Sequence, residues 1–100
     1  MGNEMKKSDL KTGYRITVKD GWAHYIVMIG ADTDYFSGDI IIDNRDGTFN
    51  WLDLNDFDDE MNNLFDRKFD IVKVERPRNP YDIFYIHRGF DVIWQRDEDE

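Results

Sequence analysis

The feature that most constrains the fold is an alternation of apolar and polar residues leading into the turn pair Asp20-Gly21. Tyr14, Ile16 and Val18 alternate with polar residues, which is the period of a half-buried strand. Glycine at the second position of the pair supplies the positive φ that a tight hairpin turn requires. The apolar run over residues 22–29 predicts the returning strand, apolar enough to be central in a sheet.

Further strand and turn signals predict a mainly β (α+β) fold. Strands are expected at residues 38–43, 48–52, 69–75, 81–87 and 90–95. The first two of these form a second hairpin across a turn at 44–47, and the last two form a third hairpin around Arg88-Gly89. Six to seven short strands indicate a small, strongly bent antiparallel sheet or an SH3-like barrel.

One short helix is expected near residues 55–66. Asn55 or Asp56 can cap its start, and acidic residues in its first turn suit the positive end of the helix dipole. Four apolar side chains fall on one face at helical spacing, the pattern of a helix that packs on a core: Phe57, Met61, Leu64 and Phe65.

The size and composition of the chain predict a single domain over residues 1–100. The chain has no cysteine, so no disulfide supports it, but 40% hydrophobic and 15% aromatic residues are sufficient for one core. Trp22, Trp51 and Trp94 lie in strand-like segments and are expected to contribute to that core. Residues 1–7 and 97–100 are expected to be flexible.

Acidic residues are concentrated between Ala31 and Asp66. This window holds eleven acidic residues and one basic residue, Arg45, so its charge of −10 accounts for nearly all of the net charge of −9. Two main interpretations are open. The aspartates can be a solvated set of turn and cap residues, or they can form a docking face for a basic protein surface, including a groove that binds nucleic acid.

A calcium loop is a third interpretation, and the spacing argues against it. Such a loop needs oxygen ligands at positions 1, 3 and 5 and a glycine at position 6. Starting from Asp32, Phe36 occupies the third ligand position; starting from Asp56, Met61 replaces the glycine. We therefore expect no metal and no cofactor.

Several other functions lack a sequence signature. His24 and His87 are the two histidines, and both are expected on strand surfaces, with no nucleophile motif near them. An acidic chain is a poor direct ligand for nucleic acid, because phosphate contacts are made by Lys and Arg. The chain has no apolar run of the roughly 18 residues that a membrane span requires. The sequence therefore predicts neither an enzyme nor a membrane protein.

Two aromatic residues, Tyr35 and Phe36, lie in a polar loop beside Asp32, Asp34 and Asp39. An aromatic side chain within an acidic rim is the combination expected of an exposed interface anchor. The alternative is that Phe36 folds back and plugs the end of the barrel.

Three stretches of the chain, taken in order, carry a resemblance to a known group. They are KKSDLKTG at 6–13, FDIVKV at 69–74 and IWQR at 93–96. Together they resemble a group of small, uncharacterised proteins encoded by phages and prophages of Firmicutes. The resemblance implies a phage origin, a compact β-rich domain and no established activity. We expect the protein in the host cytoplasm. The resemblance favours the class of small acidic phage proteins that occupy the surface of a host protein, including DNA mimics that inhibit restriction or CRISPR systems.

The sequence thus predicts a non-enzymatic, protein-binding module that occludes a basic surface of a host or defence protein. The residues expected to contact the partner are the acids Asp32, Asp34, Asp39, Asp53, Asp56, Asp58, Asp59 and Glu60, with Tyr35 or Phe36 as the anchor. The alternative is a phage structural or assembly accessory protein that self-associates or packs on virion components.

Overall fold

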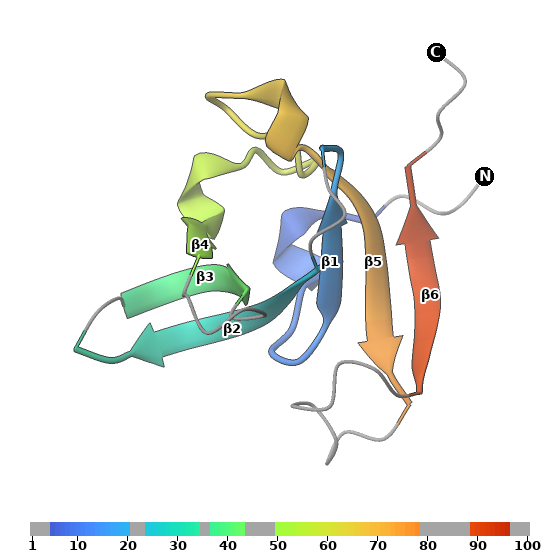
Figure 1. Ribbon diagram of the computed structural model, residues 1–100, viewed down its shortest axis with the longest axis horizontal. Coiled ribbons are helices and arrows are strands. Elements are labelled where there is room, and N and C mark those ends of the chain that lie inside the picture. Colours follow the sequence, from blue (N-terminus) through green and yellow to red (C-terminus); the bar gives the residue numbers. More distant parts are fainter. Residues whose placement is uncertain (1–4, 21–23, 35–36, 44–49, 79–88, 97–100) are drawn as a thin grey trace.

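The fold is one antiparallel sheet of six strands that bends strongly and stays open, as the computed structural model shows (Figure 1). The structure describes residues 5–20, 24–34, 37–43, 50–78 and 89–96. The strands are β1 (Arg15–Val18), β2 (His24–Asp32), β3 (Ser37–Asp43), β4 (Asn50–Asp53), β5 (Ile71–Pro77) and β6 (Phe90–Gln95). Their order in the sheet is β4-β3-β2-β1-β5-β6. The predicted mainly β fold is confirmed, as a bent sheet and not as a closed barrel.

The two hairpins predicted nearest the N-terminus are present. β1 pairs with β2 in the register Arg15 to Ile26, and β3 pairs with β4 in the register Ile42 to Trp51. β2 also pairs with β3, which gives β2 the central position that its apolar run predicts. The strand predicted at 81–87 lies outside the described residues, and β6 pairs with β5.

The bend of the sheet originates in β2. Its first residues, His24 to Ile26, pair with β1, whereas the stretch from Ile26 to Asp32 pairs with β3. Strands β2 and β3 therefore run across the direction of β1, β5 and β6 (Figure 1). The β2–β3 register shifts between Met28 and Ala31, where Gly30 has a φ of 71°. A bulge of this kind bends a strand and increases its twist.

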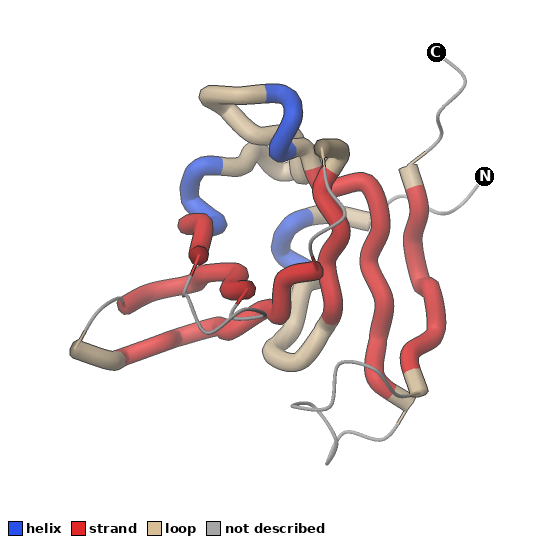
Figure 2. Tube along the Cα trace, in the orientation of Figure 1, coloured by secondary structure: helices blue, strands red, loops and turns tan. Residues whose placement is uncertain are grey.

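The core lies on one face of the bent sheet. Ile16 and Val18 of β1 are buried there, as their alternation predicts. The segment between β4 and β5 contributes Leu54, Phe57 and Met61 to the same cluster, so its turns close over one end of the sheet (Figure 2).

The three tryptophans do not share one environment. Trp94 packs against the core, as expected, and Trp22 lies outside the described residues. The core position predicted for Trp51 is wrong, because Trp51 is 41% exposed. Trp51 belongs to β4, which within the described part of the chain is an edge strand of the sheet, so fewer residues surround it.

The helix expected at 55–66 does not form. In its place an irregular loop connects two three-residue 3-10 helices, η2 (Leu54–Asp56) and η3 (Arg67–Phe69). The physical reason is competition for backbone N–H groups, because Asp and Asn side chains in this loop accept the hydrogen bonds that a helix would make internally. The cap of η2 is Asp53, and not Asn55 or Asp56 as predicted.

The N-terminal segment is attached to the domain from Met5 onward. Met5 packs against the core, and Lys7 begins the 3-10 helix η1 (Lys7–Asp9). Lys7 N donates to Asp59 O at 2.8 Å, and Lys7 Nζ donates to the carbonyl oxygens of Leu54 and Phe57 at 3.1 and 2.8 Å. Of the two ends predicted to be flexible, 1–4 and 97–100 lie outside the described residues.

An ion pair joins the two halves of the sheet. Arg15 of β1 donates from Nε and Nη2 to the two carboxylate oxygens of Glu75 on β5, both at 2.8 Å. The Glu75 side chain is 7% exposed. The hydrogen bonds from Arg15 lower the pKa of Glu75 below its ordinary value of 4.5, and they outweigh the burial that raises it.

We expect the free energy of unfolding of the Glu75→Gln variant to vary less with pH in the acid range than that of the wild type. The lowered pKa stabilises the native state fully above pH 4.5, and this contribution is lost as pH falls through the folded-state value. Urea unfolding across the acid range should therefore show a steeper loss of stability for the wild type. At neutral pH the variant should be less stable by about 1–3 kcal/mol. Glu60→Gln, on a 69% exposed side chain, is the control, and parallel curves for Glu75→Gln and wild type would contradict the ion pair's role.

Candidate functional site

The acids predicted to contact a partner fall on two separate parts of the molecule. Asp32 ends β2 and Asp34 follows it; both are exposed. They lie at the end of the β2–β3 hairpin, which projects away from the segment between β4 and β5 (Figure 1). Tyr35 and Phe36, the predicted anchors, lie outside the described residues. The structure therefore does not bring Asp32 and Asp34 together with the acids after β4.

Asp39 lies closer to those later acids. A hollow of about 280 Å³ is lined by Asp39 of β3 and by Asn55 and Asp59, with Lys7 among its other residues. The Asp39 carboxylate accepts a hydrogen bond from Gly30 N at 2.9 Å, across the β2–β3 bulge. Asp39 therefore stabilises the β2–β3 bulge and also borders this hollow.

Two of the predicted acids hold the backbone of the loop. Asp53 Oδ1 accepts from Asn55 N at 2.9 Å and so caps η2. Asp58 Oδ1 accepts from Glu60 N and Asn62 N at 3.0 and 2.9 Å. Burial raises the pKa of Asp58, but the hydrogen bonds from Asn62 and Glu60 together outweigh burial and hold the pKa below its ordinary value of 3.8. These two carboxylates are structural.

Three acids remain available to a partner: Asp56, Asp59 and Glu60. Asp59 and Glu60 are exposed, and Asp56 is half-buried. Among the described residues, one ion pair involves this set, between Glu60 and Lys6 at 3.9 Å, a distance and exposure at which such pairs contribute little. Their negative charge is therefore open to a cationic surface.

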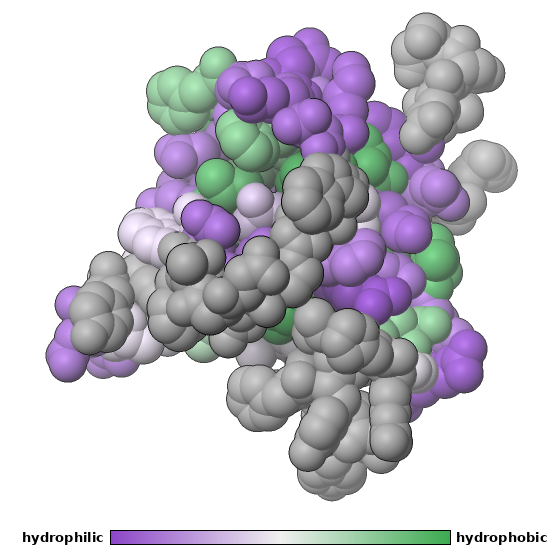
Figure 3. All heavy atoms as spheres, in the orientation of Figure 1, coloured by the Kyte–Doolittle hydropathy of each residue, from purple (hydrophilic) through white to green (hydrophobic). Residues whose placement is uncertain are grey.

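The same loop exposes two large apolar side chains. Leu64 is 58% exposed and Phe65 is 80% exposed, the largest fraction among the exposed hydrophobic residues of the described chain. Figure 3 shows hydrophobic atoms at the top of the view, beside the hydrophilic atoms of this loop. We refer to residues 56–66, with these two side chains, as the acidic loop.

A buried polar pair fixes the backbone beneath Phe65. Asn63 Oδ1 accepts from Phe65 N and Asp66 N at 2.9 and 3.0 Å. Asn63 N donates to Asp70 Oδ1 at 2.7 Å, and Arg67 Nε donates to Asp70 Oδ2 at 2.7 Å. Asn63 is 7% exposed and Asp70 is 2% exposed, so these hydrogen bonds compete little with water.

Arg96, directly after β6, holds the other side of the acidic loop. Its Nη2 donates to the carbonyl oxygens of Glu60, Met61 and Ile71 at 3.2, 3.4 and 2.9 Å, and its Nε donates to Ile71 O at 3.0 Å. Met61 is fully buried with a φ of 69°, a left-handed conformation that costs a non-glycine residue about 1–3 kcal/mol. The surrounding contacts hold this strained conformation, so the loop is preorganised.

The helix interpretation misplaced half of its apolar face. Phe57 and Met61 are buried, as that face predicts, but Leu64 and Phe65 point to solvent. The signal that distinguishes the two pairs is in the sequence: Asp58, Asn62, Asn63 and Asp66 surround the apolar residues, and Asp and Asn favour local turns over helix interiors.

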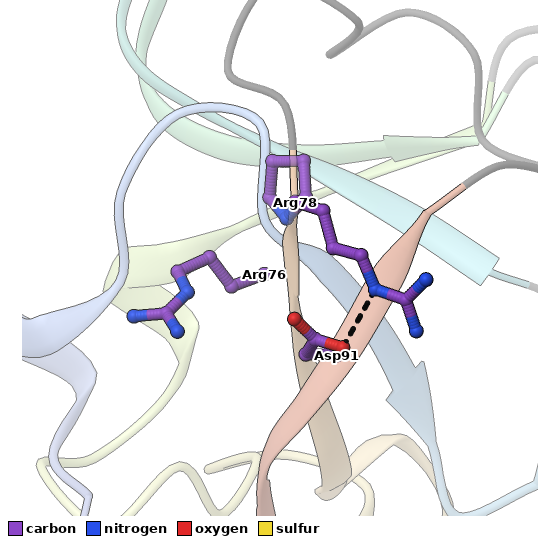
Figure 4. Close-up of a pocket in the computed structure, with 4 residues that line it drawn as sticks. Arg76, Arg78 and Asp91 are labelled. Atoms are coloured by element: carbon purple, nitrogen blue, oxygen red, sulfur yellow. Dashed lines mark hydrogen bonds and ion pairs between the residues drawn. The ribbon is translucent and has the colours of Figure 1, made fainter.

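A basic hollow lies at the opposite end of β5. Among the described residues its lining is Arg76, Pro77, Arg78 and Asp91, and its volume is about 380 Å³. Arg78 reaches across to Asp91, with Nε and Oδ1 2.8 Å apart, whereas Arg76 extends to the other side (Figure 4). We refer to these four residues as the arginine hollow. No motif or charge pattern in the sequence predicts this hollow.

Comparisons and simple site criteria add no assignment. Among the described residues, no group of three His, Asp or Glu side chains is placed to hold a metal ion, and no helix is long and apolar enough to cross a membrane. His24 lies on β2 with Nδ1 3.3 Å from Thr17 Oγ1, and His87 lies outside the described residues. No protein-family model, curated protein or solved structure matches the chain.

Proposed function

We propose that the protein is a small, phage-encoded binding module that places its acidic loop on a basic surface of a host or defence protein. It acts by occlusion: the bound module covers a surface that the partner needs, such as one that binds nucleic acid. The proposal involves no bond-making chemistry and no cofactor. The phage origin rests on the resemblance of the sequence, and the docking rests on the loop.

The observation that supports docking is an aromatic side chain, Phe65, that is 80% exposed on a fixed backbone. Interface energy is typically concentrated in a few aromatic or arginine anchors surrounded by polar contacts. A preorganised anchor loses little conformational entropy on binding, so more of its contact energy appears as affinity. A loop that needed only to be soluble would gain nothing from this exposure.

The carboxylates of Asp56, Asp59 and Glu60 give the partner its expected chemistry. Negative charge close to the anchor attracts Lys and Arg, speeds association and disfavours acidic competitors. The proposed surface is narrower than the one inferred from the sequence, because Asp53 and Asp58 hold the backbone and Asp32 and Asp34 lie on the separate hairpin. The expected partner therefore has an apolar pocket with a basic rim.

We expect the double variant Asp59→Lys, Glu60→Lys to bind its partner roughly tenfold more weakly or worse, mainly through slower association. The immobilised protein is first incubated with a Firmicutes host extract at about 0.1 M and about 1 M salt, between which the Debye length falls from about 10 Å to about 3 Å. A basic protein that is retained at low salt and lost at high salt is then purified. Surface plasmon resonance measures its association and dissociation rates with the wild type and with the double variant.

Asp32→Lys, Asp34→Lys is the matched control, since it makes the same charge change on exposed residues of the other acidic part. It should bind nearly as the wild type does. An equal loss of affinity in the two double variants would show that net charge, and not the position of the acids, determines binding. Failure to retain any basic protein at low salt would contradict the proposal. Asp58 is left unchanged, because its substitution would disturb the loop itself.

A second candidate function is that of a structural or assembly accessory protein. One observation favours it: the chain carries a basic hollow of its own, at the end of β5 opposite the acidic loop.

A further inference from the structure

The two ends of β5 carry complementary features. The acidic loop lies just before the start of β5, and the arginine hollow lies at its end, so the two are at opposite ends of the molecule (Figure 1). One end offers an exposed aromatic ring with carboxylates, and the other offers two arginines around a proline. Each end has the chemistry that the other would bind.

We infer that the acidic loop of one copy docks into the arginine hollow of a second copy. This contact does not depend on the proposed host partner, because both surfaces belong to the chain itself. The anchor is Phe65, which enters the hollow beside Pro77. The hollow, at about 380 Å³, is large enough to admit an aromatic side chain.

The arginines give the contact its specificity. A guanidinium group stacks on an aromatic face and also binds carboxylates with two parallel hydrogen bonds. Arg76 is exposed and forms no ion pair with the described residues, so it is available to a carboxylate of the incoming loop. Arg78 pairs with Asp91, but their side chains are 65% and 46% exposed, and such a pair is easily exchanged for a new one.

The geometry of the contact determines the kind of assembly. Since the loop and the hollow are different surfaces of one chain, the contact is heterologous, and repeating it yields a ring or an open chain of copies. The contact is small, so a weak association is expected, with Kd between about 10 µM and about 1 mM. A bound host protein would compete with a second copy for the same loop.

The test is sedimentation velocity of the purified full-length protein over that concentration range, at low and high salt. The wild type is expected to sediment faster as concentration rises at about 0.1 M salt and to remain monomeric at about 1 M. Phe65→Ala removes the anchor, and Arg76→Glu, Arg78→Glu reverses the hollow. Each of these variants alone should associate roughly tenfold more weakly or worse, so at concentrations near the wild-type Kd it should sediment mainly as a monomer.

The decisive measurement is the mixture of the two variants. Phe65→Ala keeps an intact hollow and the arginine variant keeps an intact loop, so the mixture should form a one-to-one dimer that grows no further. Trp51→Ala, on a 41% exposed apolar residue of β4 that lines neither the loop nor the hollow, should associate as the wild type does. Circular dichroism melts check folding, and Arg76→Ala, Arg78→Ala replaces the charge reversal if that variant is unfolded. The inference would be overturned by a monomeric wild type, by a Phe65→Ala variant that associates as strongly as the wild type, or by a monomeric mixture.

Discussion

Phe57→Ala should lower the free energy of unfolding by about 3–5 kcal/mol, the largest effect we expect from a single core substitution. Phe57 is 1% exposed, belongs to the core cluster and pairs with Asn63 across the acidic loop. Truncation removes the ring and leaves a cavity that the surrounding strands cannot fill. The total free energy of unfolding of a domain of this size is typically about 5–15 kcal/mol, so the variant should be marginally folded. Urea denaturation followed by tryptophan fluorescence gives the difference.

The matched control is the same substitution at Phe65. Because that side chain is 80% exposed, Phe65→Ala should change stability by less than about 0.5 kcal/mol. The contrast separates two phenylalanines that the sequence places on the same face of a helix. Equal effects would mean that Phe65 is packed in solution, which would also remove the anchor from the proposed docking surface.

Asp70→Ala should destabilise the protein by about 2–4 kcal/mol, although it removes few atoms. The Asp70 carboxylate is 2% exposed and accepts hydrogen bonds from Asn63 N and Arg67 Nε, both at 2.7 Å. Its loss leaves a buried N–H without an acceptor, which costs more than the hydrogen bond contributed in the folded protein. Urea denaturation measures the total effect.

Hydrogen exchange locates the effect of Asp70→Ala. The amides of Asn63, Phe65 and Asp66 should exchange faster, because the Asn63 side chain that orders the last two loses its support. Asp66→Ala is the control: Asp66 caps η3 from an exposed position, and its loss should cost about 1 kcal/mol. Unchanged exchange at Phe65 would show that the loop does not depend on Asp70.

Much of the sheet could be predicted from the sequence, because strand period and turn residues are local signals. Asp20-Gly21 and the alternation before it give the first hairpin, and the burial of Ile16 and Val18 follows from that alternation. The pairing of β1 with β5 could not be predicted in this way. It joins residues about sixty positions apart, and nothing in either strand specifies its neighbour.

The loop after β4 shows where local reasoning fails. Apolar spacing predicts a helix there, whereas Asp58 and Asn63 take the backbone N–H groups that a helix needs. Two of the acids predicted to meet a partner, Asp53 and Asp58, are occupied in this way. The backbone beneath Phe65 is linked through Asn63 to Asp70, a buried residue that no charge pattern singles out.

The position of β1 between β2 and β5 has a kinetic consequence. Strands β1 to β4 follow one another along the chain and pair in that order, so they form a meander without long loops. The other edge of β1 stays unpaired until β5 adds to it. This pairing closes a loop that contains all of the chain between β1 and β5, and closing a long loop is slow compared with forming a hairpin. Until then, an unpaired strand edge with Ile16 and Val18 uncovered is a template for intermolecular pairing. The arrival of β5 should therefore limit the folding rate and set the interval during which the chain is prone to aggregate.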